Sequence, residues 1–176
     1  MRFIAPYLAA CAALAAISGA QAFEPPVIYG TVGVIDGDTI AVNGLKVRLD
    51  GIDAPEGGQT CKTISGQTWS CGLAATEAMV LIAGKKLAMC DVTGRDRYRR
   101  RIGICRVIRP GEMSIEIGGE MVERGLAVAY RKYSLRYVPN ELRAKAFNRG
   151  MWAGEFQMPW DYRKAKKAQI RARRGM

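Results

Sequence analysis

Acidic side chains stand beside the ends of two predicted strands. The stretch VIDGDTI, residues 34–40, places Asp38 in a turn before a strand. The stretch VRLDGIDAPE, residues 47–56, places Asp53 just after an alternating strand. Between them, Asn-Gly at 43–44 is a strong hairpin signal. This hairpin would bring Asp38 and Asp53 close enough to share one hard cation, because carboxylate oxygens suit Ca²⁺ and Mg²⁺.

Three neighbouring features could act on a phosphate group. Arg48 alternates with apolar strand residues, and its guanidinium could hold a phosphate through two hydrogen bonds. Glu56 follows Pro55 in what should be a rigid turn, where a carboxylate could take a proton from water. The basic run RDRYRRR, residues 95–101, surrounds Tyr98, and such a run can bind phosphates and stack a base. Taken singly, each feature could instead be a solvated charge or a turn cap.

The composition favours a polyanionic partner and limits the possible chemistry. The chain has 27 basic and 16 acidic residues, for a formal net charge of +11. This balance is typical of proteins that bind nucleic acid or another anionic surface, although a basic surface without a partner is the alternative. The sequence contains no histidine, which excludes Ser-His-Asp triads, Cys-His pairs and histidine bases. Any chemistry must use carboxylates, arginines, lysines, tyrosines or a metal ion.

The first 22 residues have the pattern of a secretory signal peptide. A basic residue stands near the start, an apolar segment follows, and Ala-Gln-Ala at 20–22 forms a small-x-small cleavage site. The apolar run at 8–17 is shorter than the roughly 20 residues needed to span a bilayer. A lipoprotein site at Cys11 is an alternative. We therefore expect a periplasmic or secreted protein that begins at Phe23, without stable membrane insertion after cleavage.

Four cysteines remain after this cleavage, namely Cys61, Cys71, Cys90 and Cys105. An even number in an exported chain indicates disulfides, and the sequence alone allows three pairings. We favour Cys61–Cys71, which would close a short loop, and Cys90–Cys105, which would cross a hairpin. The rival interpretation is a zinc site, but the chain has neither CxxC spacing nor histidine.

The predicted elements favour a small barrel that carries helices. Strands are expected at 27–34, 39–42, 45–49, 86–92 and 101–108, with a turn near Gly94, and residues 126–130 are expected to be irregular or extended. Helices are expected at 73–83, 121–124 and 141–148, and residues 162–174 are a basic helix candidate. The pattern predicts an α+β, OB-fold-like five-stranded barrel with about three helices. We expect one domain at 23–160 and a basic C-terminal tail at 161–176.

Several motifs in combination resemble the staphylococcal nuclease (thermonuclease) family. Besides VIDGDTI and VRLDGIDAPE, the matching segments are DRYRR at 96–100, MVERGLAVAY at 121–130 and GMWAGEF at 150–156. They follow the family order and cover nearly all of the chain after the signal peptide. The cysteine-bearing segments QTC at 59–61, WSCG at 69–72 and MC at 89–90 are similar to the exported bacterial branch of the family.

The resemblance implies a Ca²⁺-dependent phosphodiesterase that acts on DNA and RNA and leaves 3′-phosphate ends. One Ca²⁺ would be held by the carboxylates of Asp38 and Asp53. Ala54 stands where the family uses a threonine carbonyl as a ligand, and alanine offers the same carbonyl group.

The resemblance also assigns roles to five polar residues. Arg48, Glu56 and Arg100 would be the catalytic groups. Tyr98 and Tyr130 would contact the nucleotide. At position 99 the chain has arginine where the family often has glycine, and a positive φ there would strain the turn by about 1 kcal/mol or more.

Two other classes of function remain open at this point. The first is a non-catalytic OB-like module that binds nucleic acid through its basic surface. The second is an envelope protein whose basic tail contacts anionic lipid, although that tail lacks a clear apolar face. We expect the protein to be a monomer.

Overall fold

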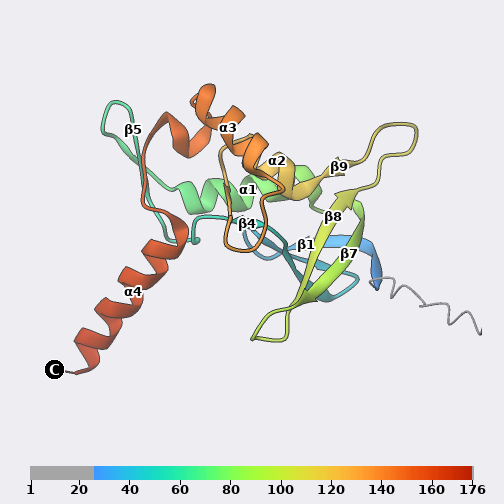
Figure 1. The fold of residues 1–176 in the computed structure, drawn as a ribbon, viewed down its shortest axis with the longest axis horizontal. Helices are drawn as coiled ribbons and strands as arrows, with labels where there is room; N and C mark the ends of the chain where they lie inside the picture. Colours follow the sequence, from blue (N-terminus) through green and yellow to red (C-terminus); the bar gives the residue numbers. More distant parts are fainter. Residues whose placement is uncertain (1–25, 176) are drawn as a thin grey trace, which may run out of the picture.

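A closed barrel of five strands lies at the centre of the computed structural model, which describes residues 26–175. The strands are β1 (Val27–Val34), β2 (Thr39–Val42), β3 (Leu45–Leu49), β7 (Leu87–Arg95) and β8 (Arg101–Val107). Neighbours pair antiparallel in the order β3-β2-β1-β7-β8, and a parallel pairing of β3 with β8 closes the barrel (Figure 1). The expected OB-like α+β fold is therefore confirmed. The predicted signal peptide lies outside the described residues.

Short strands attach further segments to this barrel. The short strands are β4 (Ile52–Asp53), β5 (Cys61–Thr63), β6 (Thr68–Trp69), β9 (Ile115–Glu116), β10 (Val128–Ala129) and β11 (Gly154–Glu155). β4 pairs with β10, β5 pairs with β6 and β11, and β9 continues the sheet beyond β8. The β4–β10 pairing matters for function because it fixes the backbone of Asp53 opposite Val128.

The hairpin between β2 and β3 forms as the sequence predicts. Asn43 (φ 49°) and Gly44 (φ 76°) both adopt left-handed backbone conformations, as the two central residues of a type I′ turn require. The register places Thr39 opposite Arg48. Because side chains alternate along β3, Val47 is fully buried in the core while Arg48 is only partly covered.

The turn between β7 and β8 differs from the prediction. It occupies residues 96–100, whereas the sequence suggested a turn near Gly94. A register shift beside Gly94 marks a bulge inside the hairpin, which is a common use of glycine in a strand. The Asp96 carboxylate builds the actual turn by accepting the N–H groups of Tyr98 (2.8 Å) and Arg100 (3.0 Å).

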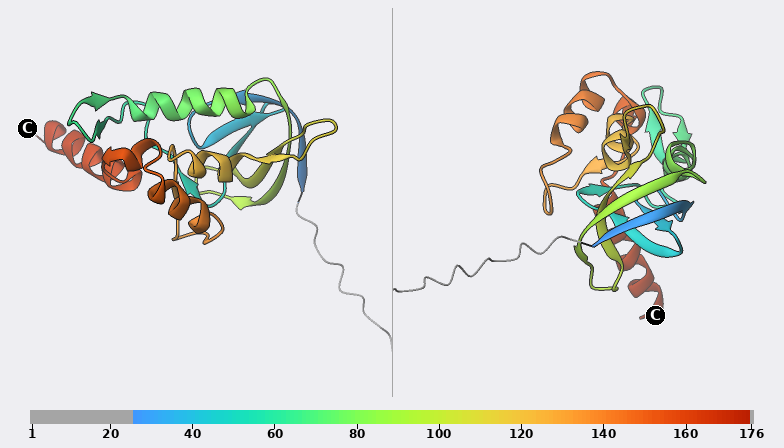
Figure 2. Two further views of the ribbon diagram at one scale, coloured as in Figure 1. Left: turned by 90° about the horizontal axis from the view of Figure 1, so that it is seen from above. Right: turned by 90° about the vertical axis from the view of Figure 1, so that its right-hand side faces the viewer.

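Four α-helices are present in residues 26–175: α1 (Cys71–Ala83), α2 (Ile117–Glu123), α3 (Val138–Ala146) and α4 (Pro159–Arg174). A 3₁₀ helix spans Gly150–Ala153. Figure 2 shows α2 between α1 and α3, and α2 also contacts β8. Side chains from α1, α2 and the barrel interior form the main hydrophobic core, which includes Ile40, Met79, Ile117 and Met121.

The three helices expected before the tail are present, but each begins earlier than predicted. Pro139 lies in the first turn of α3, where its missing N–H costs nothing, so this helix begins at Val138. α2 begins at Ile117 and includes Gly118 despite its poor helix propensity. A Cβ at Gly118 would lie 2.9 Å from the Tyr137 hydroxyl oxygen, so close packing accounts for glycine here.

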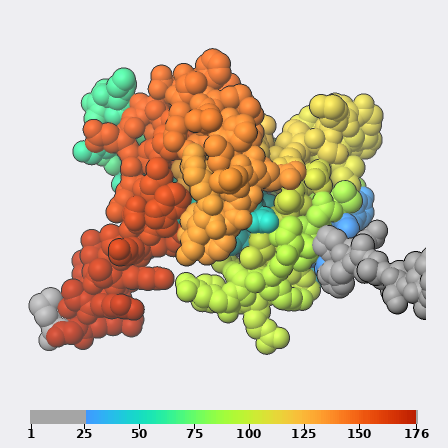
Figure 3. Space-filling model, viewed as in Figure 1, coloured from blue at the N-terminus to red at the C-terminus, as the bar shows by residue number. Residues whose placement is uncertain are grey.

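The predicted tail forms most of α4, which projects from the body of the molecule (Figures 1 and 3). The helix carries seven basic residues and one acidic residue, and Pro159 is its single buried residue. Within residues 26–175, none of the helices combines the length and apolar character needed to cross a membrane.

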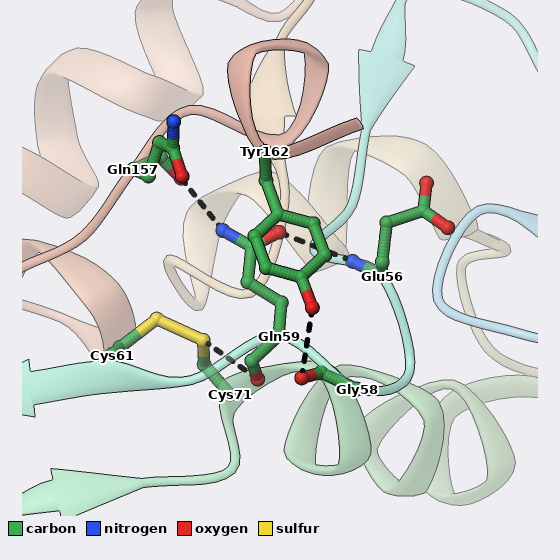
Figure 4. Close-up of a disulfide and its surroundings, with 7 residues drawn as sticks. All are labelled: Glu56, Gly58, Gln59, Cys61, Cys71, Gln157 and Tyr162. Atoms are coloured by element: carbon green, nitrogen blue, oxygen red, sulfur yellow. Dashed lines mark hydrogen bonds between the residues drawn. A yellow bond between two sulfur atoms is a disulfide. The ribbon is translucent and has the colours of Figure 1, made fainter. Parts of the chain in front are cut away.

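Two disulfides join Cys61 to Cys71 and Cys90 to Cys105, which is the pairing that the sequence favours. Cys90 and Cys105 are direct partners in the β7–β8 ladder and are buried. The Cys61–Cys71 bridge ties β5 to the start of α1 (Figure 4).

Removing the hairpin disulfide with a Cys90→Ala/Cys105→Ala double variant is expected to destabilise the protein by about 3 kcal/mol. The bridge closes a loop with a sequence separation of 15, and this constraint on the unfolded chain is lost in the variant. Urea denaturation without reductant measures the change. In a reducing buffer the wild type loses its Cys90–Cys105 bridge, and the difference in unfolding free energy should disappear. Equal unfolding free energies of oxidised wild type and variant would contradict the prediction.

Candidate active site

A pocket of about 720 Å³ opens at one rim of the barrel. Five separate segments contribute to it: the turn before β2, the stretch from β3 to the turn after β4, the β7–β8 loop, the segment after β10, and α4. The pocket therefore brings together most of the predicted site residues, which are Asp38, Arg48, Ala54, Glu56, Tyr98, Arg100 and Tyr130. It also contains two residues of α4 that sequence reasoning did not assign, Arg163 and Lys167.

Asp38 and Asp53 form an acidic centre that shares one guanidinium group. Arg48 Nη1 lies 2.8 Å from Asp38 Oδ1, and Arg48 Nη2 lies 2.8 Å from Asp53 Oδ1. The two carboxylates are almost completely buried, with exposed fractions of 5% and 0% for the residues. The predicted proximity of the two carboxylates is thus present, with a cationic group already between them.

The position of Asp38 follows from a tight turn. Asp36 Oδ1 accepts the Asp38 N–H at 3.0 Å, so Asp36 acts as the turn cap. A Cβ on Gly37 would lie 2.8 Å from Ala54 Cβ, and only glycine lets the turn approach so closely. The Asp38 carbonyl accepts the Leu49 N–H at 2.8 Å, which ties the turn to the end of β3.

The environment of Asp38 opposes a bare negative charge. Burial raises the pKa of Asp38 to about 7, Arg48 acts in the opposite direction, and the charges of Asp36 and Asp53 add to the increase. Its Oδ2 accepts the Ala54 N–H at 3.4 Å, so Ala54 lies beside the same carboxylate. A pair of buried carboxylates with a neighbouring main-chain segment is a donor set that fits a hard cation. Among residues 26–175, however, no cluster of three or more acidic, cysteine or histidine side chains could hold a metal.

A buried glutamine fixes the turn that carries Glu56. Gln59 Oε1 accepts the Glu56 N–H at 3.3 Å, and Gln59 Nε2 donates to the Gln157 carbonyl at 2.7 Å (Figure 4). A side chain at Gly72 would collide with the Glu56 carbonyl, so glycine allows α1 to pack directly on this turn. Figure 4 shows the Glu56 carboxylate pointing away from Gln59.

The β7–β8 loop supplies Arg100 and the exposed ring of Tyr98. Arg100 Nε lies 2.7 Å from Asp96 Oδ2, and its guanidinium carbon lies 5.7 Å from the centre of the Tyr98 ring. Tyr98 is 63% exposed. Arg99 has φ 65°, which is the left-handed conformation that costs about 1 kcal/mol or more outside glycine.

Tyr130 differs from Tyr98 because aromatic partners already cover it. Its ring stacks on Trp160 at 5.2 Å with an interplanar angle of 12°, and Tyr133 meets it edge-on at 4.8 Å. Its N–H donates to the Gly51 carbonyl at 2.8 Å. An assembled aromatic cluster therefore forms this wall of the pocket.

Arg163 is the site residue that sequence reasoning missed. Its Nη1 and Nη2 lie 3.0 and 2.8 Å from Asp53 Oδ1 and Oδ2, and Nη1 lies 2.9 Å from Glu56 Oε1. Pro159 at the start of α4 could have indicated a helix that begins before residue 162. Nothing in the spacing shows which basic residue of that helix enters the pocket.

Comparison with known proteins now identifies the family. Residues 46–154, more than half of the chain, match the family described as staphylococcal nuclease homologue. The chain belongs to the staphylococcal nuclease family. A micrococcal nuclease from Shigella flexneri is 30% identical over 149 residues, which cover 77% of this chain and 80% of that protein. An uncharacterized endonuclease from Haemophilus influenzae is 32% identical over 147 residues, covering 79% of this chain and 74% of that protein.

A further relative matches over a smaller part of both chains. The succinoglycan biosynthesis protein ExoI from Rhizobium meliloti is 40% identical over 98 residues, which cover 55% of this chain and half of that protein's length. Membership of the staphylococcal nuclease family supports nuclease activity in general. The family match ends at residue 154, before α4 begins, so it does not include Arg163.

A cluster of charged residues around Glu141 supports the strand that carries Asp53. Glu141 on α3 is buried, and its Oε2 accepts the N–H of Ala129 in β10 at 2.9 Å. Arg131 and Lys145 form ion pairs with the same carboxylate at 3.1 and 2.6 Å. Burial acts to raise the pKa of Glu141, but these hydrogen bonds outweigh it and hold the pKa below its usual range. Because β10 pairs with β4, this cluster holds the strand that carries Asp53.

A Glu141→Gln variant is expected to lower the free energy of unfolding at pH 7 by about 2–3 kcal/mol, because it weakens charge-assisted hydrogen bonds at a buried site. The depressed pKa means that this contribution is present above the unfolded pKa of about 4.3 and is lost as the pH falls through the folded pKa. Urea denaturation between pH 7 and pH 3 should therefore show a difference that shrinks on acidification. Glu112→Gln, at an exposed ion pair, is the control and should change little. A difference independent of pH would contradict this role for Glu141.

Proposed function

We propose that this protein is a Ca²⁺-dependent nuclease that hydrolyses phosphodiester bonds in DNA and RNA. The observation that carries the proposal is the Asp38–Arg48–Asp53 arrangement, in which Arg48 pairs with two buried carboxylates, and Asp38 and Arg48 line one pocket with Glu56 and Arg100. Two carboxylates for a cation, guanidinium groups for a phosphate and a carboxylate for a water molecule are the parts that such hydrolysis needs.

The cation would be one Ca²⁺ held by Asp38, Asp53 and the Ala54 carbonyl. When bound, it would reduce the negative charge on a phosphate oxygen. Asp38 and Asp53 face the same guanidinium group, so their oxygens converge on one region rather than on separate surfaces. In this role the two carboxylates would bind and position the cation, and water would complete its coordination.

Arg48 and Arg100 would bind the phosphate from two sides. Arg48 comes from the barrel wall, and Arg100 comes from the β7–β8 loop, where Asp96 holds its Nε. Their remaining N–H groups can donate to the phosphate oxygens as negative charge grows in the transition state. A donor of this kind typically lowers the activation free energy by about 3–4 kcal/mol.

Glu56 would orient the attacking water or accept its proton. The turn that carries Glu56 is held through Gln59, so the carboxylate starts from a fixed backbone. Proton transfer to a positioned carboxylate typically accelerates a reaction by about 10²–10⁴-fold. Tyr98 and Tyr130 would contact the nucleotide, Tyr98 by stacking on a base.

We also propose that the mature chain begins at Phe23 and works outside the cytoplasm as a monomer, in the periplasm or after secretion. The two disulfides support the location outside the cytoplasm, because such bonds persist in oxidising compartments. Residues 23–160 would be the nuclease domain and residues 161–176 a basic extension of it. Because binding would rely on basic groups, substrate affinity should fall steeply with salt.

The test is digestion of plasmid DNA and of RNA by the mature protein with Ca²⁺, Mg²⁺ or Mn²⁺, and with a chelator. The proposal expects products with Ca²⁺, none with the chelator, and 3′ ends that can be joined to a 5′-phosphorylated adaptor only after treatment with a 3′-phosphatase. An Asp53→Asn protein purified in the same way controls for a contaminating nuclease. Binding of nucleic acid without products under any metal would instead support a non-catalytic module.

A further inference from the structure

We propose that Arg163 competes with the divalent cation for the acidic centre and so sets the cation concentration that the site requires. This inference rests on the proposed function in one respect, namely that Asp38 and Asp53 hold the cation. It concerns a residue of α4, which lies beyond the segment that matches the nuclease family.

The first argument is that both carboxylate oxygens of Asp53 already accept guanidinium N–H groups. Its Oδ2 accepts Arg163 Nη2 at 2.8 Å, and its Oδ1 accepts both Arg163 Nη1 at 3.0 Å and Arg48 Nη2 at 2.8 Å. A Ca²⁺ ion approaches carboxylate oxygens to 2.3–2.6 Å and repels nearby positive charge. A guanidinium that bridges both oxygens therefore occupies the position of the cation and already supplies a neutralising positive charge.

The second argument is that Arg163 also binds the carboxylate proposed to act on water. Its Nη1 lies 2.9 Å from Glu56 Oε1, while it donates to Asp53 at the same time. A Glu56 oxygen that already accepts a guanidinium N–H is less available to a water molecule. Displacement of Arg163 would free Asp53 and Glu56 together, so one movement links cation entry to the release of the proposed base.

The third argument is that α4 is attached to the body near its first turns only. Trp160 stacks on Tyr130, and the Tyr162 hydroxyl donates to the Gly58 carbonyl at 3.1 Å (Figure 4). Beyond Lys167 every helical residue of α4 is exposed, and the helix projects from the body (Figure 3). The Arg163 side chain can therefore leave the pocket without disturbing the barrel core.

The size of the effect follows from the competition. If the form without the Arg163 contact is about a tenth of the population, the apparent cation affinity is reduced about tenfold. Arg163→Gln removes the competing charge and, for that population, should bind Ca²⁺ about tenfold more tightly than the wild type. Arg163→Lys keeps the charge but loses the bidentate hydrogen bonds to Asp53. Its affinity for Ca²⁺ should lie between those of the wild type and Arg163→Gln.

The test is calorimetric titration of the mature protein with Ca²⁺ in the absence of nucleic acid. Lys166→Gln is the matched control, because it removes one positive charge from an exposed residue of the same helix outside the pocket. Its affinity should stay within about twofold of the wild type, since exposed charges at a distance are screened. Thermal unfolding gives a second measurement: Arg163→Gln should melt lower than the wild type without Ca²⁺ and gain more from its addition.

The outcomes separate this inference from the proposed function. Tighter Ca²⁺ binding by Arg163→Gln but not by Lys166→Gln supports the competition. Equal affinities of wild type and Arg163→Gln, weaker binding by Arg163→Gln, or no binding by either protein overturns it. If the wild type still digests nucleic acid with Ca²⁺ in that case, the proposed function stands without this role for Arg163.

Discussion

Arg48→Lys is expected to lower kcat/KM for DNA by about 10²–10³-fold at saturating Ca²⁺. Lysine keeps the positive charge but has one terminal nitrogen and no planar fork, whereas Arg48 reaches Asp38 and Asp53 with separate nitrogens. The same planar fork would bind two phosphate oxygens in the transition state. Steady-state hydrolysis of a short labelled oligonucleotide measures the change.

The matched control for this variant is Arg106→Lys on β8. Arg106 forms an ion pair with Asp91 and lies outside the pocket, so its replacement should leave kcat/KM within a few-fold of the wild type. An Arg48→Lys enzyme as active as that control would show that Arg48 serves the fold and not the phosphate.

Glu56→Gln is expected to lower kcat by about 10²–10⁴-fold with little change in KM. Glutamine has nearly the same shape but cannot accept the proton of the attacking water. The exposed Glu155 provides a control, because Glu155→Gln removes one carboxylate outside the pocket. The assay should be paired with a Ca²⁺ titration, in which Glu56→Gln should lose no affinity for the ion. Full kcat in the variant would remove Glu56 from the mechanism, and a matching loss of Ca²⁺ affinity would make it a ligand instead.

The parts of the site that follow from local sequence could be predicted well. The Asn43-Gly44 turn fixes the register of β2 with β3, and that register alone places Arg48 opposite Thr39 and beside Asp38. Local alternation also shows that Arg48 lies on the opposite side of β3 from Val47. The closed barrel follows from five such strand signals, although no local signal shows that β3 pairs in parallel with β8.

The parts that depend on distant packing could not be predicted. Glycine is a common turn residue, so the sequence suggests a turn at Gly94. The side chain of Asp96 instead organises the turn, which begins two residues later. Arg163 is one basic residue among several on α4, and its contact with Asp53 joins positions 110 residues apart. A helical period in the sequence predicts which residues share one face of α4, but it does not predict which part of the protein that face contacts.

The most direct test of the acidic centre is a crystal structure of the mature protein with Ca²⁺ and a phosphorothioate oligonucleotide that resists hydrolysis. We expect an anomalous signal for one ion between Asp38 and Asp53, with a phosphate oxygen within hydrogen-bond distance of Arg48 and Arg100. An ion bound elsewhere, or a phosphate held by neither arginine, would contradict the proposed mechanism.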